Sequence, residues 1–139
     1  MSKCFSKDFF ECLSDIRLNN NSTWYQENKV RVNSARKEME EFANLLIPMV
    51  KNFDSNIGVY EAKKTMYRQH RDIRFSKDKS SLKTYISSVI FYGIDKKINT
   101  PCYYIHLEDG HCMIAGGMYR PERDDLRKIR TLPQPISVQ

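Results

Sequence analysis

The segment CYYIHLEDGHCMIAGG, residues 102–117, decides the fold because it predicts two strands joined by a very short loop. The dipeptide Asp109-Gly110 lies between its two apolar halves, and both residues tolerate the positive φ angles of a two-residue hairpin turn. A loop of that length sets the register of the whole hairpin. The expected cross-strand pairs are Glu108 with His111, Leu107 with Cys112, and Cys102 with Gly117.

Other runs of β-branched and aromatic residues extend this hairpin into a sheet. They lie at residues 65–73 and 84–92, in addition to the hairpin strands at 102–107 and 112–118. We therefore expect an antiparallel sheet of about four strands.

The N-terminal third of the chain predicts two helices. Apolar residues recur every three or four positions between Phe5 and Ile16, and the asparagine triplet at 19–21 should stop this first helix. A similar pattern predicts a second helix from about residue 24 to residue 47, where Pro48 should end or kink it. At 1.5 Å per residue, that helix would be about 36 Å long, enough to cross a small sheet.

Capping signals refine this layout. Thr23 can cap the second helix, with Gln26 completing a capping box. Pro121 predicts the start of a short closing helix, with Leu126 and Ile129 as its inward face. The expected fold class is α+β: two N-terminal helices, the second long, packed on the antiparallel sheet and followed by the short closing helix.

The composition describes one folded domain without a membrane segment. With 139 residues, 40% of them hydrophobic, the chain can bury one ordinary core. We assign residues 1–139 to a single domain, with an irregular tail at 131–139. No apolar run approaches the roughly 20 residues of a membrane helix, and the charged N-terminal stretch lacks the pattern of a secretion signal. We expect a soluble, cytoplasmic protein.

Positive charge is concentrated between Lys63 and Lys83. Eight of the 23 lysines and arginines lie in this stretch, against only two acidic residues, Asp72 and Asp78. Its net charge of +6 equals that of the entire chain. A function that depends on charge is therefore expected here, with an anion as the ligand. A glycine-rich phosphate loop is missing from the stretch, which excludes a nucleotide site of the P-loop kind.

A long motif, RQHRDIRFSKDK, occupies residues 68–79. It is accompanied by N-N-x-x-x-W-Y-x-x-N-K at residues 19–29, a tyrosine-rich stretch at 103–107, and G-G-x-Y-x-P-E-x-x-x-L-x-x-I-R at 116–130. Over nearly the whole chain up to Arg130, these patterns resemble an uncharacterised family of mainly bacterial and fungal proteins, the domain of unknown function 2461. The resemblance implies a fold and candidate residues, but it implies no reaction.

Two departures from the family pattern bear on the site. The family usually has a tyrosine three residues after the last lysine of the central motif, where this chain has Leu82. Any role of that phenol is therefore absent here. Family members also continue past the closing helix, so the resemblance implies that this chain is a C-terminally shortened member.

If the strand that begins at residue 65 extends to residue 75, alternate side chains lie on one face. Arg68 and Arg74 would then share a face with Asp72 between them, and the carboxylate would orient two guanidinium groups that suit phosphate or carboxylate oxygens. Asn28 interrupts the apolar stripe of the long helix and needs hydrogen-bond partners: Asp72 can supply an acceptor, and the alternative is a buried amide that is satisfied without the motif. The candidate ligand-binding residues are Arg68, Arg71, Arg74, Lys77, Lys79, Asn28 and Lys29.

Three functions remain open from the sequence. The first is a binding module whose basic stretch, residues 63–83, holds a phosphate-bearing or other anionic ligand, either a small molecule or nucleic acid. The second is an enzyme of hydrolase or phosphoryl-transfer type, with Asp72 or Asp78 as the catalytic general base. The third is a structural or interaction domain in which both aspartates neutralise arginines and fasten the sheet to the long helix.

Histidines and acidic residues also gather at the hairpin turn, and we interpret them as surface charge pairs. Glu108 is expected opposite His111, but the spacing places no third metal ligand beside them, and the cysteines lack the paired spacing of a zinc site. We expect no metal, no cofactor and no membrane partner. The oligomeric state stays open.

Overall fold

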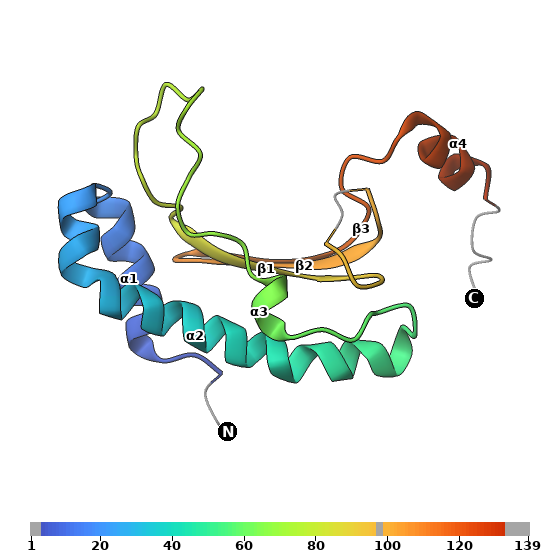
Figure 1. The fold of residues 1–139 in the computed structure, drawn as a ribbon, viewed down its shortest axis with the longest axis horizontal. Helices are drawn as coiled ribbons and strands as arrows, with labels where there is room; N and C mark the ends of the chain where they lie inside the picture. Colours follow the sequence, from blue (N-terminus) through green and yellow to red (C-terminus); the bar gives the residue numbers. More distant parts are fainter. Residues whose placement is uncertain (1–3, 97–98, 133–139) are drawn as a thin grey trace.

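The computed structural model describes residues 4–96 and 99–132, which form four helices and one antiparallel sheet of three strands. The helices are α1 (Lys7–Leu18), α2 (Ser22–Phe53), α3 (Ala62–Thr65) and α4 (Arg123–Thr131), and the strands are β1 (Tyr85–Phe91), β2 (Cys102–Glu108) and β3 (His111–Gly117). α1 and α2 lie beneath one face of the sheet (Figure 1). The expected α+β class with a long second helix is confirmed. Of the tail predicted at 131–139, residues 133–139 lie outside the described residues.

The hairpin of β2 and β3 has the register that its sequence predicts. Glu108 pairs with His111, and Cys102 pairs with Gly117 at the other end of the ladder. Gly110 in the turn has a φ of 76°, in the left-handed region that favours glycine. β1 pairs antiparallel with the other edge of β2, so the strand order is β1-β2-β3.

The strand predicted at residues 65–73 is wrong, and the sheet has three strands rather than about four. The first of these residues ends α3, and the following segment forms only two isolated bridges. They join Met66 to Ser88 and His70 to Leu82.

Residues 70–82, here named the basic loop, leave the sheet and return to it (Figure 1). A backbone hydrogen bond of 2.9 Å from Lys83 N to Gln69 O closes the base of the loop. Inside it, the carboxylates of Asp72 and Asp78 each accept a hydrogen bond from a backbone N–H two residues later. Such bonds compete with strand pairing and turn the backbone, which explains why the pairing that reaches Arg71 and Ser81 does not continue farther into the loop.

α2 begins earlier and ends later in the sequence than predicted. Asn21 caps it in place of Thr23, because its side-chain oxygen accepts from the backbone N–H three residues later at 2.9 Å. The helix also continues through Pro48 to Phe53. Pro48 removes one backbone hydrogen bond, but Val50 beyond it is buried in the core and holds the last turn in place. Within the described residues, no helix is long and apolar enough to cross a membrane.

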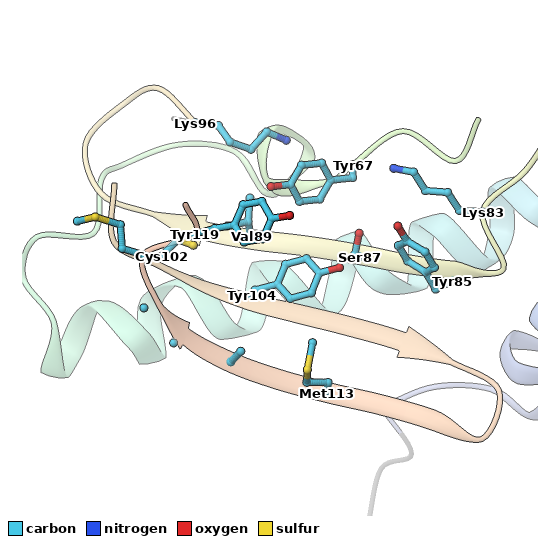
Figure 2. Close-up of a pocket in the computed structure, with 14 residues that line it drawn as sticks. Tyr67, Lys83, Tyr85, Ser87, Val89, Lys96, Cys102, Tyr104, Met113 and Tyr119 are labelled. Carbon is cyan, nitrogen blue, oxygen red and sulfur yellow. The ribbon is translucent and has the colours of Figure 1, made fainter. Parts of the chain in front are cut away.

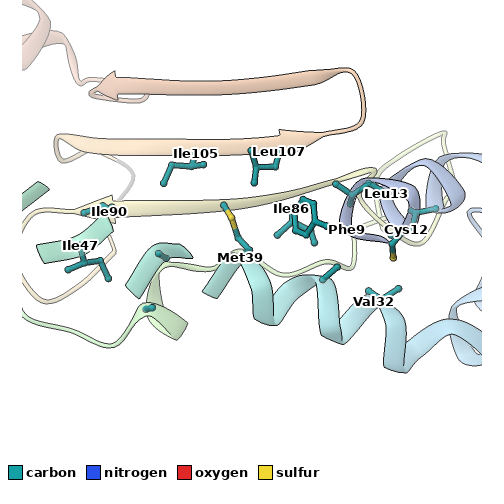
Figure 3. Packing of buried hydrophobic residues seen from close by; sticks show 14 of the residues in the cluster. Phe9, Cys12, Leu13, Val32, Met39, Ile47, Ile86, Ile90, Ile105 and Leu107 are labelled. Carbon is teal, nitrogen blue, oxygen red and sulfur yellow. The ribbon is translucent and has the colours of Figure 1, made fainter. Parts of the chain in front are cut away.

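One hydrophobic core fills the space between the sheet and the helices α1 and α2 (Figure 3). Met39 of α2 and Ile90 of β1 are 0% exposed, and Leu13 of α1 is 1% exposed. We call this side of the sheet the covered face. Its strand residues are Ile86, Ile90, Ile105 and Leu107. The opposite side is the open face.

β3 and α4 differ from the rest of the fold, because none of their residues is buried. α2 packs against β1, and α1 packs against β2, which leaves β3 at the edge. The predicted inward orientation of Leu126 and Ile129 is wrong in the described part of the chain: α4 stands apart from the sheet, and Ile129 is 48% exposed (Figure 1).

Candidate functional site

The open face of the sheet carries a pocket of about 650 Å³ (Figure 2). Its floor consists of alternate residues of all three strands, because alternate side chains of a strand share one face. These floor residues include Tyr85, Ser87 and Val89 of β1, Cys102 and Tyr104 of β2, and Met113 and Ala115 of β3. The segments that flank the strands complete the lining with Tyr67, Lys83, Lys96, Met118 and Tyr119.

Four of the lining residues are tyrosines. The rings of Tyr67 and Tyr104 meet edge to face, with centroids 6.4 Å apart. Burial raises the pKa of Tyr67 and of Tyr85 above its ordinary value, so both hydroxyls keep their protons at neutral pH. Aromatic rings with polar tips suit a ligand that has a flat or apolar body and a few polar groups.

Lys83 and Lys96 lie on either side of the Tyr67 ring (Figure 2), with their ammonium nitrogens 5.6 and 4.3 Å from its centroid. Lys96 also donates to the carbonyl of Met66 at 3.0 Å. Partial burial lowers the pKa of both lysines, and the charge of Lys83 lowers that of Lys96 further. No aspartate or glutamate is among the described residues that line the pocket, so the positive charge there is not compensated locally.

Two arginines add to this positive charge from outside the pocket lining. Arg68 and Arg36 both lower the pKa of Lys83 through their charges, after the larger effect of burial. Arg36 of α2 donates to the backbone carbonyl of Tyr67 at 2.9 Å and so ties the pocket wall to the long helix. Sequence reasoning identified Arg68 but missed Arg36 and Lys96, because neither belongs to a motif.

In the basic loop, arginines pair with the two aspartates. Arg74 donates twice to Asp72, from Nε to Oδ1 at 3.0 Å and from Nη2 to Oδ2 at 2.7 Å. Arg71 pairs with Asp78, whose pKa is lowered to about 2 mainly by the backbone N–H of Ser80 and next by Arg71. Both pairs lie inside the loop. The structural hypothesis expected them to join the sheet to α2, and they do not.

The remaining motif lysines lie away from the pocket lining. Lys79 donates to the carbonyl of Ile73 at 3.0 Å, inside the basic loop, and Lys77 is exposed. Of the motif residues predicted to bind the ligand, Arg68 and Arg71 are linked to the pocket, because their charges lower the pKa of Lys83 and of Tyr85, respectively. The basic stretch nevertheless contributes Lys83 and Tyr67 to the lining.

Of the two alternatives for Asn28, the structure shows an amide that is satisfied without Asp72. The Asn28 side chain donates to the backbone carbonyl one turn earlier in α2, at 2.9 Å, and Lys29 is exposed. α2 contacts the basic loop through Tyr25 instead, whose ring meets the ring of His70 edge to face at 4.7 Å. Asn28 and Lys29 therefore lie apart from the residues that form the pocket.

Asn20 has a role that sequence reasoning missed. Its side chain forms two hydrogen bonds with the backbone of Leu82, donating to the carbonyl at 2.8 Å and accepting from the N–H at 2.9 Å. It thereby fixes the point at which the chain returns from the basic loop, one residue before Lys83. The signal was present, because Asn20 belongs to the asparagine pattern that resembles the family.

A chain of polar groups runs along β2 on the open face. The hydroxyl of Tyr104 lies 3.1 Å from Nδ1 of His106, and Nε2 of His106 lies 3.3 Å from Glu108. Glu108 also accepts from the hydroxyl of Thr84, which is the main reason that its pKa is lowered. The side chains of His106 and Glu108 are 13% and 23% exposed. The hydrogen-bond partner of Glu108 is therefore His106 on its own strand, although His111 lies opposite it in the ladder as predicted.

These features define an α+β domain with a tyrosine-lined, positively charged pocket on the open face of a three-stranded sheet. The family model described as "Conserved hypothetical protein (DUF2461)" matches residues 8–132, so the chain belongs to this family. This match confirms the resemblance seen in the sequence motifs. No curated protein and no solved structure matches the chain.

Proposed function

We propose that this chain is a cytoplasmic binding module for a phosphate-bearing or otherwise anionic small molecule, and that the ligand occupies the open-face pocket. The observation that carries the proposal is the pair of lysines, the half-buried Lys83 and the more exposed Lys96, in a lining without a carboxylate among the described residues. Removing an ammonium group from water costs free energy unless a counter-charge approaches it. An anionic ligand would supply that counter-charge through charge-assisted hydrogen bonds.

The size and lining of the pocket support a small molecule in preference to nucleic acid. A volume of about 650 Å³ lies within the usual range for small-molecule sites. Nucleic acid binding would instead call for a track of cations along successive phosphates. In the basic loop, Arg71 and Arg74 already have aspartate partners, which supports a role for the loop in attracting anions more than in holding them.

The enzyme hypothesis has less support in the form that the sequence suggested. Asp72 and Asp78 each pair with an arginine, and hydrogen bonds keep the pKa of both below the ordinary value. A carboxylate with a low pKa is a weak general base. Neither aspartate lines the pocket.

The proposal is tested by calorimetric titration of the purified chain with phenyl phosphate, inorganic phosphate and a single-stranded oligonucleotide. Lys83→Gln and Lys96→Gln should each weaken phenyl phosphate binding about tenfold or more, because each removes one charge-assisted hydrogen bond. Lys77→Gln is the matched control, since it removes an exposed charge of the same motif, and it should leave the affinity unchanged.

Two results would contradict the pocket as the site. One is an equal loss of affinity in Lys77→Gln and Lys83→Gln, which would assign the anion to the basic loop. The other is tight oligonucleotide binding that falls steeply with salt while phenyl phosphate does not bind, which would favour nucleic acid. Thermal melts of every variant show whether a lost affinity reflects lost folding.

A further inference from the structure

The pocket of the proposed function is rich in hydrogen-bond donors. Lys83 and Lys96 carry ammonium groups, which donate and cannot accept. The hydroxyls of Tyr67 and Tyr85 stay protonated because burial raises their pKa. An anion satisfies such donors, but a ligand that also carries its own O–H or N–H would need a fixed acceptor. Tyr104 has the surroundings that make a tyrosine an acceptor.

The carboxylate of Glu108 accepts from the hydroxyl of Thr84, which lowers its pKa and keeps it ionised at neutral pH. An ionised carboxylate has no proton to donate, so Nε2 of His106, 3.3 Å away, must carry the hydrogen between them. In a neutral imidazole, the other nitrogen is then an acceptor.

The Tyr104 hydroxyl carries a single proton. With Nδ1 of His106 as an acceptor 3.1 Å away, that proton is donated to the imidazole. The oxygen lone pairs of Tyr104 then remain for other partners. Because Tyr104 lines the pocket, between Ser87 and Met113 in Figure 2, these lone pairs are available to a bound molecule.

The positions of these groups are held by packing. The His106 ring stacks on Tyr85 of β1, with centroids 4.2 Å apart and an interplanar angle of 29°. His111 of β3 contacts the His106 ring edge to face, with centroids 5.8 Å apart. β1 and β3 therefore hold the imidazole between them while Tyr104 and Glu108 occupy its two nitrogens.

We infer that Tyr104, oriented by His106 and Glu108, is a hydrogen-bond acceptor for the ligand, so that the pocket selects anionic molecules that also carry an O–H or N–H group. Hydroxylated phosphates and hydroxy acids belong to this class, whereas plain aryl or alkyl phosphates do not. This inference rests on the proposed function, because the ligand must first enter the pocket. Tyr104 contacts the ligand, and His106 and Glu108 are positioning residues.

The first measurement is the tautomer of His106, read from the nitrogen-15 and proton chemical shifts of its ring in the labelled protein at neutral pH. The inference requires a neutral imidazole with its hydrogen on Nε2. A hydrogen on Nδ1 would overturn it, because Tyr104 would then accept from the histidine and present its own proton to the pocket. A structural role for these residues alone would not require either tautomer.

The second measurement compares phenyl phosphate with its ortho-, meta- and para-hydroxy derivatives by calorimetric titration. At least one hydroxy derivative should bind the wild-type chain about fivefold more tightly than phenyl phosphate, the effect of one neutral hydrogen bond. Tyr104→Phe should remove this preference, so that phenyl phosphate and its hydroxy derivatives bind the variant with about equal affinity. Tyr119→Phe is the matched control, because Tyr119 also lines the pocket but is 64% exposed and outside the Tyr104–Glu108 chain.

The outcomes separate the two proposals. If phenyl phosphate binds and no hydroxy derivative binds more tightly, the acceptor at Tyr104 is wrong and the anion site stands. The same conclusion follows if Tyr119→Phe removes the preference as fully as Tyr104→Phe. If none of the four phosphates binds the folded wild-type chain, the proposed function fails, and the inference fails with it.

Discussion

The two faces of the sheet come from the same strands, yet one face packs against helices and the other lines the pocket. On the covered face, Ile86, Ile90 and Ile105 are no more than 2% exposed and pack against helices. On the open face, the alternate positions carry Tyr85 and Tyr104, and the lining lysines lie beside them. The difference teaches that substitutions on the covered face should change stability, whereas those on the open face should change binding.

The largest expected effect is a loss of stability from the covered face. Met39→Ala removes a side chain that is 0% exposed at the centre of the core, and it should lower the free energy of unfolding by about 2–5 kcal/mol. Urea unfolding followed by circular dichroism measures this change. A loss below about 1 kcal/mol would show that the core is not packed around Met39 as described.

A smaller loss of stability is expected at Asn20, which lies between α1 and α2 and binds the end of the basic loop. Asn20→Ala leaves both backbone groups of Leu82 without their partner, which should cost about 1–3 kcal/mol in unfolding free energy. Asn19→Ala is the control, because its side chain bonds only to an exposed carbonyl of α1; a change within about 0.5 kcal/mol is expected. Equal effects in the two variants would show that the hydrogen bonds between Asn20 and Leu82 do not stabilise the fold.

A pH-dependent effect should come from Asp54, at the C-terminal cap of α2. Hydrogen bonds from Tyr92 at 2.7 Å and from Tyr103 at 2.8 Å lower its pKa in the folded chain. Between the folded and unfolded pKa values, the unfolded chain binds more protons. The contribution of Asp54 to stability is therefore full above its ordinary pKa of 3.8 and is lost as the pH falls through the folded value.

Asp54→Asn tests this linkage. The variant should be less stable than the wild type at pH 7. The difference should shrink as the pH falls below about 4, because the unfolded wild-type chain then takes up a proton at this carboxyl while the folded chain still holds it ionised. Thermal melts of both proteins at pH 7, 5 and 3.5 measure it. A difference that stays constant with pH would show that the charge of Asp54 does not contribute.

The smallest expected effect on stability lies in the basic loop. Arg74 and Asp72 form an ion pair on an exposed surface, and such pairs contribute little in water. Arg74→Ala should change the unfolding free energy by less than about 0.5 kcal/mol, as measured by urea unfolding. A loss comparable to that of Asn20→Ala would mean that the loop belongs to the folding core.

The hairpin register and the two N-terminal helices could be predicted because their signals are local. Asp109-Gly110 sets the turn, and the apolar spacing from Phe9 to Ile16 sets the buried side of α1. The strand predicted at 65–73 failed because Thr65 ends α3 and because, at the other end of the range, Asp72 bonds to the backbone N–H of Arg74. That competition depends on backbone conformation, which an alternation pattern does not contain.

The sequence by itself determined the α+β class, the hairpin pairing, the family and the concentration of positive charge in residues 63–83. Only the tertiary structure decided which of those charges face a pocket. Lys83 lines it together with Lys96, which is separated from it by the whole of β1, whereas Arg71 and Arg74 pair inside the loop. The physical reason is that burial and charge pairing depend on contacts between distant segments, and those contacts exist only after the chain has packed.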